Sequence, residues 1–158
     1  MRIAKPVADR LLKEGIPMNL GRAYEYITGF RDDEKLRASF NDLTEKTFGF
    51  NFVDYYKNGF WGENYIPCSI MDNGRIVSNV SVNLMDFYAD GIRKRYIQLG
   101  TVMTDKEYRG QGLSRYLMER VVSEYKHKCE DMYLFANANA TEFYPKFGFI
   151  RSPEHSII

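Results

Sequence analysis

The sequence predicts a single α/β domain of the layered α+β kind, with a mixed, mostly antiparallel central sheet flanked by helices. Two observations predict this fold. Asn73-Gly74 and Asp90-Gly91 each separate long runs of strand-forming residues, and both dipeptides supply the positive φ of tight hairpin turns. Further on, a strand-like run, a glycine-rich loop, a helix-like run and a short apolar run follow one another. That order is a βαβ crossover, so one pair of strands should be parallel.

The first predicted strand covers residues 23–30, which are rich in Tyr and Ile and bounded by glycines. Asp32 or Asp33 then caps a helix. Its apolar side chains recur at i, i+4 and i+7, as expected for an amphipathic helix, and they are Leu36, Phe40 and Leu43.

A segment dense in aromatic side chains follows at residues 48–62. Asn51 followed by Asp54 resembles a helix cap, so we expect a second short helix that ends near Gly59.

The hairpin signals predict a three-stranded meander with strands at residues 65–71, 75–88 and 93–104. On the middle strand one face is apolar, with Val80, Val82 and Leu84, and the other is polar, with Asn79, Ser81 and Asn83. The alternation shifts at Met85, where a β-bulge is one explanation.

The most informative segment, residues 108–114, lies between the strand and the helix of the predicted crossover. Two glycines allow a tight turn and leave N–H groups free at the positive end of the helix dipole, where a phosphate or pyrophosphate can bind. Arg109 adds a charged contact to such an anion. The alternative is an ordinary glycine-rich turn. The loop lacks the Gly-Lys-Ser/Thr of a Walker P-loop and the third glycine of a dinucleotide fingerprint.

The helix after this loop is expected to bury a stripe of Leu113, Leu117 and Val121, and residues 132–136 fit a buried strand.

The loop resembles motif A of the GNAT superfamily of acyl-CoA-dependent N-acyltransferases, Gln/Arg-x-x-Gly-x-Gly/Ala. The matching residues are Arg109, Gly110, Gln111, Gly112, Leu113 and Ser114, and Ser114 stands where the family usually has Gly or Ala. Downstream, residues 137–149 resemble motif B, in which an Asn ends a strand, a short helix carries a Tyr, and Gly-Phe follows. The two motifs occur in the family's order, and the resemblance covers roughly residues 33–149.

The resemblance implies how acetyl-CoA is held. Two neighbouring strands, here residues 97–104 and 132–137, splay apart around the pantetheine arm. Main-chain groups of Val102, Met103 and Thr104 bond the pantetheine amides, and the glycine loop holds the pyrophosphate. The physical requirement is a free strand edge at that place.

The resemblance also implies that Tyr144 is the general acid that protonates the departing thiolate. A phenol is protonated at neutral pH and can donate to sulfur. The alternative role for Tyr144 is packing beside Phe143 and Phe147. Asn137 either holds the cofactor or the Tyr144 backbone, or caps the helix that follows it.

No general base is assigned from the sequence. Asp86, Asp105 and Glu142 are carboxylates near the relevant strand ends, and Gln98 lies on the strand but does not titrate. The aromatic segment at residues 48–62 either lines the pocket for the acceptor amine, including by cation–π contact, or fills the core.

Residues 1–20 are expected to form an arm or a short helix, and residues 21–158 a single GNAT acetyltransferase domain that lacks the usual last strand. Pro153 disfavours continuation of the strand at residues 148–151. The resulting free edge would be covered by a second copy in a homodimer, or by residues 3–12 packing back on their own sheet.

The net charge of +1 gives no reason to expect nucleic-acid or membrane binding. No apolar run has membrane-spanning length, and no signal peptide is evident. We therefore expect a cytoplasmic protein in which Cys68 and Cys129 are reduced thiols. The two cysteines and two histidines form no metal-ligand pattern, so no metal is expected.

The function predicted from these features is transfer of an acetyl group from acetyl-CoA to a primary amine, on a small molecule or an exposed amino group. The rival is a non-catalytic acyl-CoA-binding or sensing domain. A plain nucleotide-binding module would need the phosphate-loop Lys that this sequence lacks.

Overall fold

The computed structural model describes residues 1–3 and 24–153. Within these residues one seven-stranded sheet runs in the order β2-β3-β4-β5-β6-β1-β7. Its strands are β1 (Arg2–Ile3), β2 (Tyr24–Thr28), β3 (Tyr65–Asp72), β4 (Arg75–Ala89), β5 (Ile92–Thr104), β6 (Asp131–Leu134) and β7 (Phe149–Ile150). The helices are α1 (Glu34–Phe48), α2 (Val53–Lys57) and α3 (Leu113–Tyr125), with short 3-10 turns η2 (Lys106–Tyr108), η3 (Ala138–Ala140) and η4 (Tyr144–Phe147).

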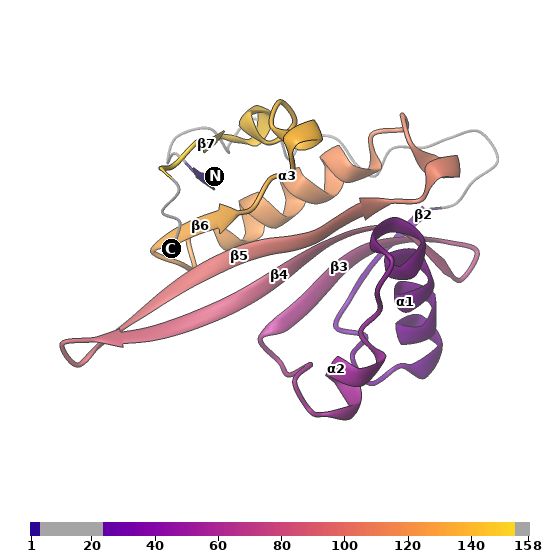
Figure 1. Ribbon diagram of the computed structural model, residues 1–158, viewed down its shortest axis with the longest axis horizontal. Coiled ribbons are helices and arrows are strands. Elements are labelled where there is room, and N and C mark those ends of the chain that lie inside the picture. The colour runs from indigo at the N-terminus through magenta and orange to yellow at the C-terminus, as the bar shows by residue number, and fades with distance from the viewer. Residues whose placement is uncertain (4–23, 154–158) are drawn as a thin grey trace.

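Both predicted hairpins are confirmed. Strands β3, β4 and β5 form an antiparallel meander. At its turns, Asn73 and Gly74 have φ values of 49° and 77°, and Asp90 and Gly91 have φ values of 53° and 75°. Two successive positive φ angles give a turn whose twist matches that of the strands it joins. The β4–β5 hairpin is so long that its tip projects from the body of the molecule (Figure 1).

The predicted crossover is also confirmed. Strand β5, helix α3 and strand β6 follow one another, and β5 pairs with β6 in parallel from Tyr96 opposite Asp131 to Leu99 opposite Leu134. Helix α3 lies on one side of the sheet, and α1 and α2 lie on the other (Figure 1). The domain therefore has three layers, with helices on both faces of a mixed sheet.

Each face of the sheet has its own core. The α3-side core includes Val80, Val82, Ile97, Leu99, Leu117, Val121, Met132 and Leu134. The α1-side core consists of Phe30, Phe40, Leu43, Trp61, Ile76 and Met103. Alternate residues of β4 and β5 point into one core or the other, as the period of two along a strand requires.

The bulge predicted at Met85 is wrong. Strand β4 pairs regularly with β5 from Ser81 to Ala89. The ladder instead shifts between Asn79 and Ser81, which lie opposite Met103 and Gly100. Asn79 and Ser81, two residues of the predicted polar face, are buried, and their side chains are hydrogen-bonded to each other.

The first helix begins as predicted, since Asp33 accepts a hydrogen bond from the backbone N–H of Leu36 at 3.0 Å. The second helix is shorter than predicted. Its N-cap residue is Phe52, which makes no side-chain cap bond, although Asn51 Oδ1 accepts from the N–H of Val53 at 3.1 Å.

The far end of the sheet differs most from expectation. The two residues of β1 pair antiparallel with both β6 and β7, so the N-terminal segment contributes a strand between them. Met1 and Leu134 exchange backbone hydrogen bonds of 2.7 and 2.8 Å, which extends this pairing by one residue. The chain thus covers the edge of β6 itself. The rest of the predicted arm, at residues 4–20, lies outside the described residues.

Candidate active site

The glycine loop follows β5 and leads into α3, as the sequence predicted. Gly110 and Gly112 have φ values of 76° and 81°, in the left-handed region that favours glycine. Gly112 is the N-cap of α3, and no side chain caps this helix in the described chain. The first N–H groups of α3 therefore have no intrahelical or side-chain partner, which suits an anionic ligand.

The side chains of the loop are anchored around these N–H groups. Gln111 accepts a hydrogen bond from the Tyr24 hydroxyl on β2. The Ser114 hydroxyl is hydrogen-bonded to that of Thr104 at the end of β5. Arg109 is exposed, and its Nε donates to the Thr104 carbonyl at 3.3 Å. Ser114 in place of Gly or Ala is thus explained by a bond that joins α3 to β5.

Strands β5 and β6 part beyond Leu99 and Leu134, the last pair in their ladder. Residues 100–104 of β5 have no partner strand on that side in the described chain. Val102 packs against the α3-side core, and Met103 lies in the α1-side core. The free strand edge expected at Val102, Met103 and Thr104 is therefore present in the described chain.

A buried polar network lies beside this opening. Asn79 Nδ2 donates to the Thr101 carbonyl and to Ser81 Oγ, both at 2.9 Å, and Asn79 Oδ1 accepts from Ser69 at 2.7 Å. Thr101 has a φ of 48°, an uncommon conformation for a β-branched residue. Its hydroxyl is 2.8 Å from the Tyr65 hydroxyl. The sequence analysis assigned no role to Tyr65 or Thr101 and placed Asn79 on the polar face of its strand. The available signal for a buried network was the presence of Ser78, Asn79 and Ser81 among the apolar residues of β4.

Tyr144 begins η4 and is 7% exposed. Its ring packs against Phe143 and Phe149, with centroids 5.3 and 6.3 Å away. Burial raises the pKa of Tyr144 above its ordinary value, which keeps the phenol protonated at neutral pH. Among the described residues its hydroxyl has no hydrogen-bond partner, so the group is available to a ligand.

Asn137 is exposed and follows β6 by three residues. Its side chain does not cap η3, and only its backbone carbonyl accepts, from the N–H of Ala140 at 3.0 Å.

Of the three carboxylates considered as general bases, two accept hydrogen bonds within the protein and one is exposed. Hydrogen bonds from Arg95 and Arg93 hold the pKa of Asp86 well below its usual range, so this carboxylate is a poor base. Asp105 caps η2 by accepting from the N–H of Glu107 at 3.0 Å. Glu142 is exposed.

The aromatic segment before β3 is divided between the α1-side core and the surface, with Phe48 among its exposed side chains. Phe52, Tyr55 and Trp61 pack around Tyr65, with ring centroids 5.3 to 6.0 Å from it. Burial raises the pKa of Tyr65 to about 12. Phe50 and Phe60 remain exposed.

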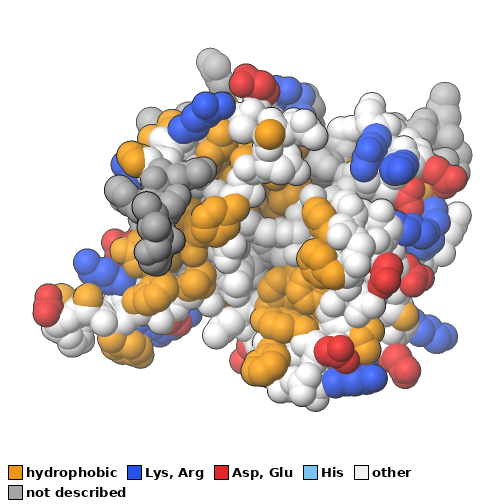
Figure 2. All heavy atoms as spheres, in the orientation of Figure 1, with side chains coloured by type: hydrophobic (Ala, Val, Ile, Leu, Met, Phe, Trp, Pro, Cys, Tyr) orange, Lys and Arg blue, Asp and Glu red, His pale blue; other side chains and the backbone are white. Residues whose placement is uncertain are grey.

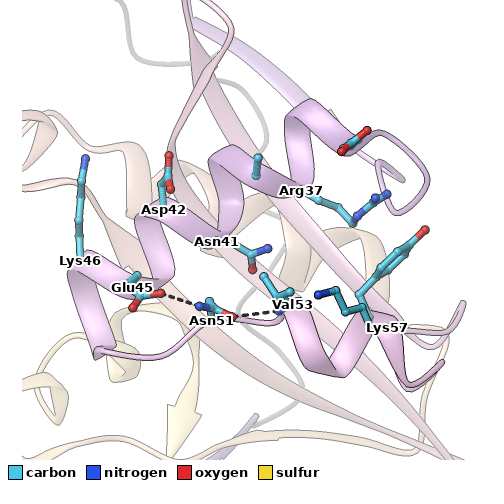
Figure 3. A pocket seen from close by; sticks show the side chains of 11 residues that line it. Arg37, Asn41, Asp42, Glu45, Lys46, Asn51, Val53 and Lys57 are labelled. Atoms are coloured by element: carbon cyan, nitrogen blue, oxygen red, sulfur yellow. Dashed lines mark hydrogen bonds between the residues drawn. The ribbon is translucent and has the colours of Figure 1, made fainter.

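A pocket lies between α1 and α2 (Figure 3). Two contacts join α1 to the α2 segment across this pocket. Asn51 Nδ2 donates a hydrogen bond to Glu45 at 2.6 Å, and the Arg37 guanidinium lies 3.8 Å from the centre of the Tyr56 ring. None of its lining residues belongs to β5, β6 or the glycine loop. We therefore interpret it as the seam that fixes α2 on α1.

Cys68 is buried, and burial raises the pKa of its thiol. Neither cysteine forms a disulfide. Residues 1–3 and 24–153 contain no cluster of three or more His, Cys, Asp or Glu that could hold a metal ion. No helix in these ranges has the length and apolar character needed to cross a membrane.

Residues 33–151 match the model of the acetyltransferase (GNAT) domain family. This match spans most of the chain, and the protein therefore belongs to the GNAT acetyltransferase family. None of the curated protein sequences matches it.

Solved structures share the fold at low sequence identity. Glucosamine-6-phosphate N-acetyltransferase from Arabidopsis thaliana superimposes with a TM-score of 0.67 at 17% identity, covering 86% of this chain and 97% of that one. A predicted acetyltransferase from Clostridium acetobutylicum, solved with acetyl-CoA, gives 0.66 at 19% identity over 86% and 96%. An aminoglycoside N-acetyltransferase in complex with CoA gives 0.68 at 12% identity over 87% and 95%.

Proposed function

We propose that this protein transfers the acetyl group of acetyl-CoA to a primary amine by direct attack, with Tyr144 as the general acid. The observation that carries the proposal is the coincidence of three features at one end of the sheet. Among the described residues, these are the edge of β5 beyond Leu99 that pairs with no strand, the N-terminus of α3 that no side chain caps, and the hydroxyl of Tyr144 that has no hydrogen-bond partner.

The donor-binding residues follow from these features. The pyrophosphate of acetyl-CoA binds the N–H groups of residues 110–114, with Arg109 as a charged contact. The pantetheine amides bond the free edge of β5 at Val102, Met103 and Thr104, and the exposed amide of Asn137 contacts the donor from the β6 side. Solved GNAT structures that hold acetyl-CoA and CoA support this assignment by shared fold.

The chemistry needs a neutral amine, a polarised thioester and a protonated leaving group. The amine lone pair attacks the carbonyl carbon, so a C–N bond forms and the C–S bond breaks. The thiolate takes a proton from Tyr144, the surplus proton on nitrogen passes to solvent, and Tyr144 regains a proton from solvent. Asp86 is excluded as a base by its two arginine partners.

The rival, a non-catalytic acyl-CoA-binding domain, would use the same loop and strand edge. The Tyr144 hydroxyl favours the enzyme, because a Tyr kept for packing alone has no need of an unpaired polar group in a mostly buried position.

The test combines binding with turnover. CoA is titrated calorimetrically, and thiol release from acetyl-CoA is followed with a panel of amines: an amino sugar, an amino-sugar phosphate, an aminoglycoside, a polyamine and short peptides. Binding with amine-dependent thiol release supports the enzyme, and binding without it supports the rival. No CoA binding contradicts both.

We also propose that two copies associate as a homodimer. A bare strand edge at β6 does not support this dimer, since β1 and β7 continue the sheet beyond β6. The observation that supports the dimer is the apolar end of the β4–β5 hairpin, where Phe87, Tyr88 and Ile92 are exposed.

A further inference from the structure

A groove of about 1080 Å³ runs along β6 on the face of the sheet opposite α3. Its floor is aromatic, with Tyr96, Tyr133 and Phe135 among the lining residues, and Tyr133 and Phe135 pack edge to face at 5.8 Å. Strand register explains this face. Tyr133 lies opposite Gln98 of β5 and Arg2 of β1, whereas its neighbours Met132 and Leu134 fill the α3-side core.

The groove begins where β5 and β6 part. Leu134 is the last β6 residue paired with β5, and Leu134, Phe135 and Ala136 all line the groove. A molecule lying in it therefore has one end at the mouth of the opening in which the donor thioester would lie.

The charged side chains of the groove are two arginines and one carboxylate. Arg2 and Arg151 line it, and both are exposed. Within the part of the chain that the structure describes, neither guanidinium takes part in an ion pair. The carboxylate is Asp131, at the start of β6, and one of its oxygens already accepts from the N–H of Met132 at 2.9 Å. The groove thus offers an excess of positive charge and planar donors suited to phosphate or carboxylate.

Resting on the proposed function, we propose that this groove is the acceptor site and that the acceptor amine carries an anionic group, a phosphate or a carboxylate, held by Arg2 and Arg151. Strand spacing sets the size of such a molecule. Arg2 is level with Tyr133, two residues before Phe135, and one strand away, so its Cα lies on the order of 8 Å from the mouth of the opening. A sugar phosphate or the N-terminus of an acidic peptide spans that distance, whereas a polycationic amine is repelled by the charges of the two arginines.

A binding experiment tests the groove independently of turnover. Glucosamine 6-phosphate and glucosamine, which differ only in the phosphate, are each titrated calorimetrically into protein saturated with CoA. We expect glucosamine 6-phosphate to bind at least tenfold more tightly, and the Arg2→Gln/Arg151→Gln double variant to lose that preference. The Arg93→Gln variant is the matched control, because Arg93 is paired with Asp86 on the hairpin and does not line the groove. It should keep the preference.

A second pair of probes, the C-terminally amidated peptides Ser-Glu-Ala and Ser-Gln-Ala, which differ only in the side-chain carboxylate, distinguishes a carboxylate from a phosphate as the anion. Preference for the anionic member of either pair, lost in the double variant alone, supports the proposal. Equal binding within both pairs, or a preference that survives loss of both arginines, overturns it.

Turnover measured with the same four probes distinguishes the anion-selective acceptor site from the proposed acetyltransferase activity. If the anionic probes bind through the arginines but no amine releases thiol, the proposed function fails and the anion site stands. If neutral and cationic amines are acetylated as fast as anionic ones, the acetyltransferase stands and the anion-selective acceptor site fails.

Discussion

The side-chain amide of Asn79 on β4 donates a 2.9 Å hydrogen bond to the backbone carbonyl of Thr101 on β5. This bond spans the place where the ladder between the two strands shifts. It holds Thr101 at a φ of 48°, in the stretch of β5 that has lost its partner on the other side. A fully buried amide thus fixes the strand edge along which we place the donor.

Replacing Asn79 tests this relationship. Asn79→Ala removes hydrogen bonds to Ser69, Ser81 and Thr101 and leaves their polar atoms buried. We expect a loss of about 3 kcal/mol in the free energy of unfolding, measured by urea denaturation. Asn83→Ala, four residues along the same strand and outside this network, should cost less than about 1 kcal/mol. Equal losses in the two variants would contradict the role given to Asn79.

The glycine loop predicts a change in CoA affinity. At Gly112, with a φ of 81°, a valine side chain strains the backbone and occupies space at the N-terminus of α3. Gly112→Val should weaken CoA binding by at least tenfold in calorimetry. Gly91→Val is the control, since Gly91 has a similar φ of 75° but lies at the hairpin tip. It should lower stability and leave CoA affinity unchanged.

The hairpins and the crossover could be predicted because their signals are local. Asn73-Gly74 and Asp90-Gly91 carry the turn geometry in two adjacent residues. Strand β1 could not be predicted, because two residues have no period and form a strand only by pairing with segments more than 120 positions away.

Features that depend on several strands also lay beyond the sequence. The β-bulge lies where Asn79 hydrogen-bonds to Ser69 of β3 and Thr101 of β5. The alternation of apolar and polar residues breaks at Met85 because the helices no longer cover the sheet there and the exposed part of the hairpin begins. The groove joins Arg2 and Arg151, from opposite ends of the chain, through the pairing of β1 with β7.

The acid role of Tyr144 predicts a specific kinetic change. Tyr144→Phe keeps the ring packing and removes the proton donor, so turnover should fall about a hundredfold while acetyl-CoA affinity stays nearly constant. The control is Tyr125→Phe at a partly buried tyrosine on α3, and this variant should keep full turnover. Because burial raises the pKa of Tyr144, the phenol stays protonated in mildly alkaline solution. At pH values below about 10, deprotonation of Tyr144 should therefore not reduce the wild-type turnover. A Phe variant with unchanged turnover would assign Tyr144 to packing.

The ion pairs of Asp86 predict a pH-dependent contribution to stability. Arg95 and Arg93 lower the pKa of Asp86 in the folded protein, so the stabilisation is present above the unfolded-state pKa of about 3.9 and is lost as the pH falls through the folded-state value. Asp86→Asn should therefore lower the Tm at pH 7, and the gap to the wild type should narrow below about pH 4. Glu142→Gln, which removes an exposed carboxylate, should show no such narrowing. Thermal unfolding monitored by circular dichroism measures both.

The projecting hairpin predicts self-association. The end of the β4–β5 hairpin extends beyond the body of the protein, and hydrophobic side chains are exposed on this projection (Figures 1 and 2). Phe87, Tyr88 and Ile92 are 50%, 76% and 62% exposed. By the strand register, Phe87 and Ile92 share one face of the hairpin, and Tyr88 lies on the other. An apolar patch on a protruding element is typical of an interface, and a two-fold dimer covers the same patch on both copies. Light scattering at micromolar concentration should give the mass of two chains, and Phe87→Ser/Ile92→Thr, which removes the apolar side chains of one face, should give the mass of one. Phe60→Ser removes an equally exposed aromatic near α2 and should leave the dimer intact. A wild-type mass of one chain would rule out the stable dimer, and a dimer that survives the hairpin substitutions would place the interface elsewhere.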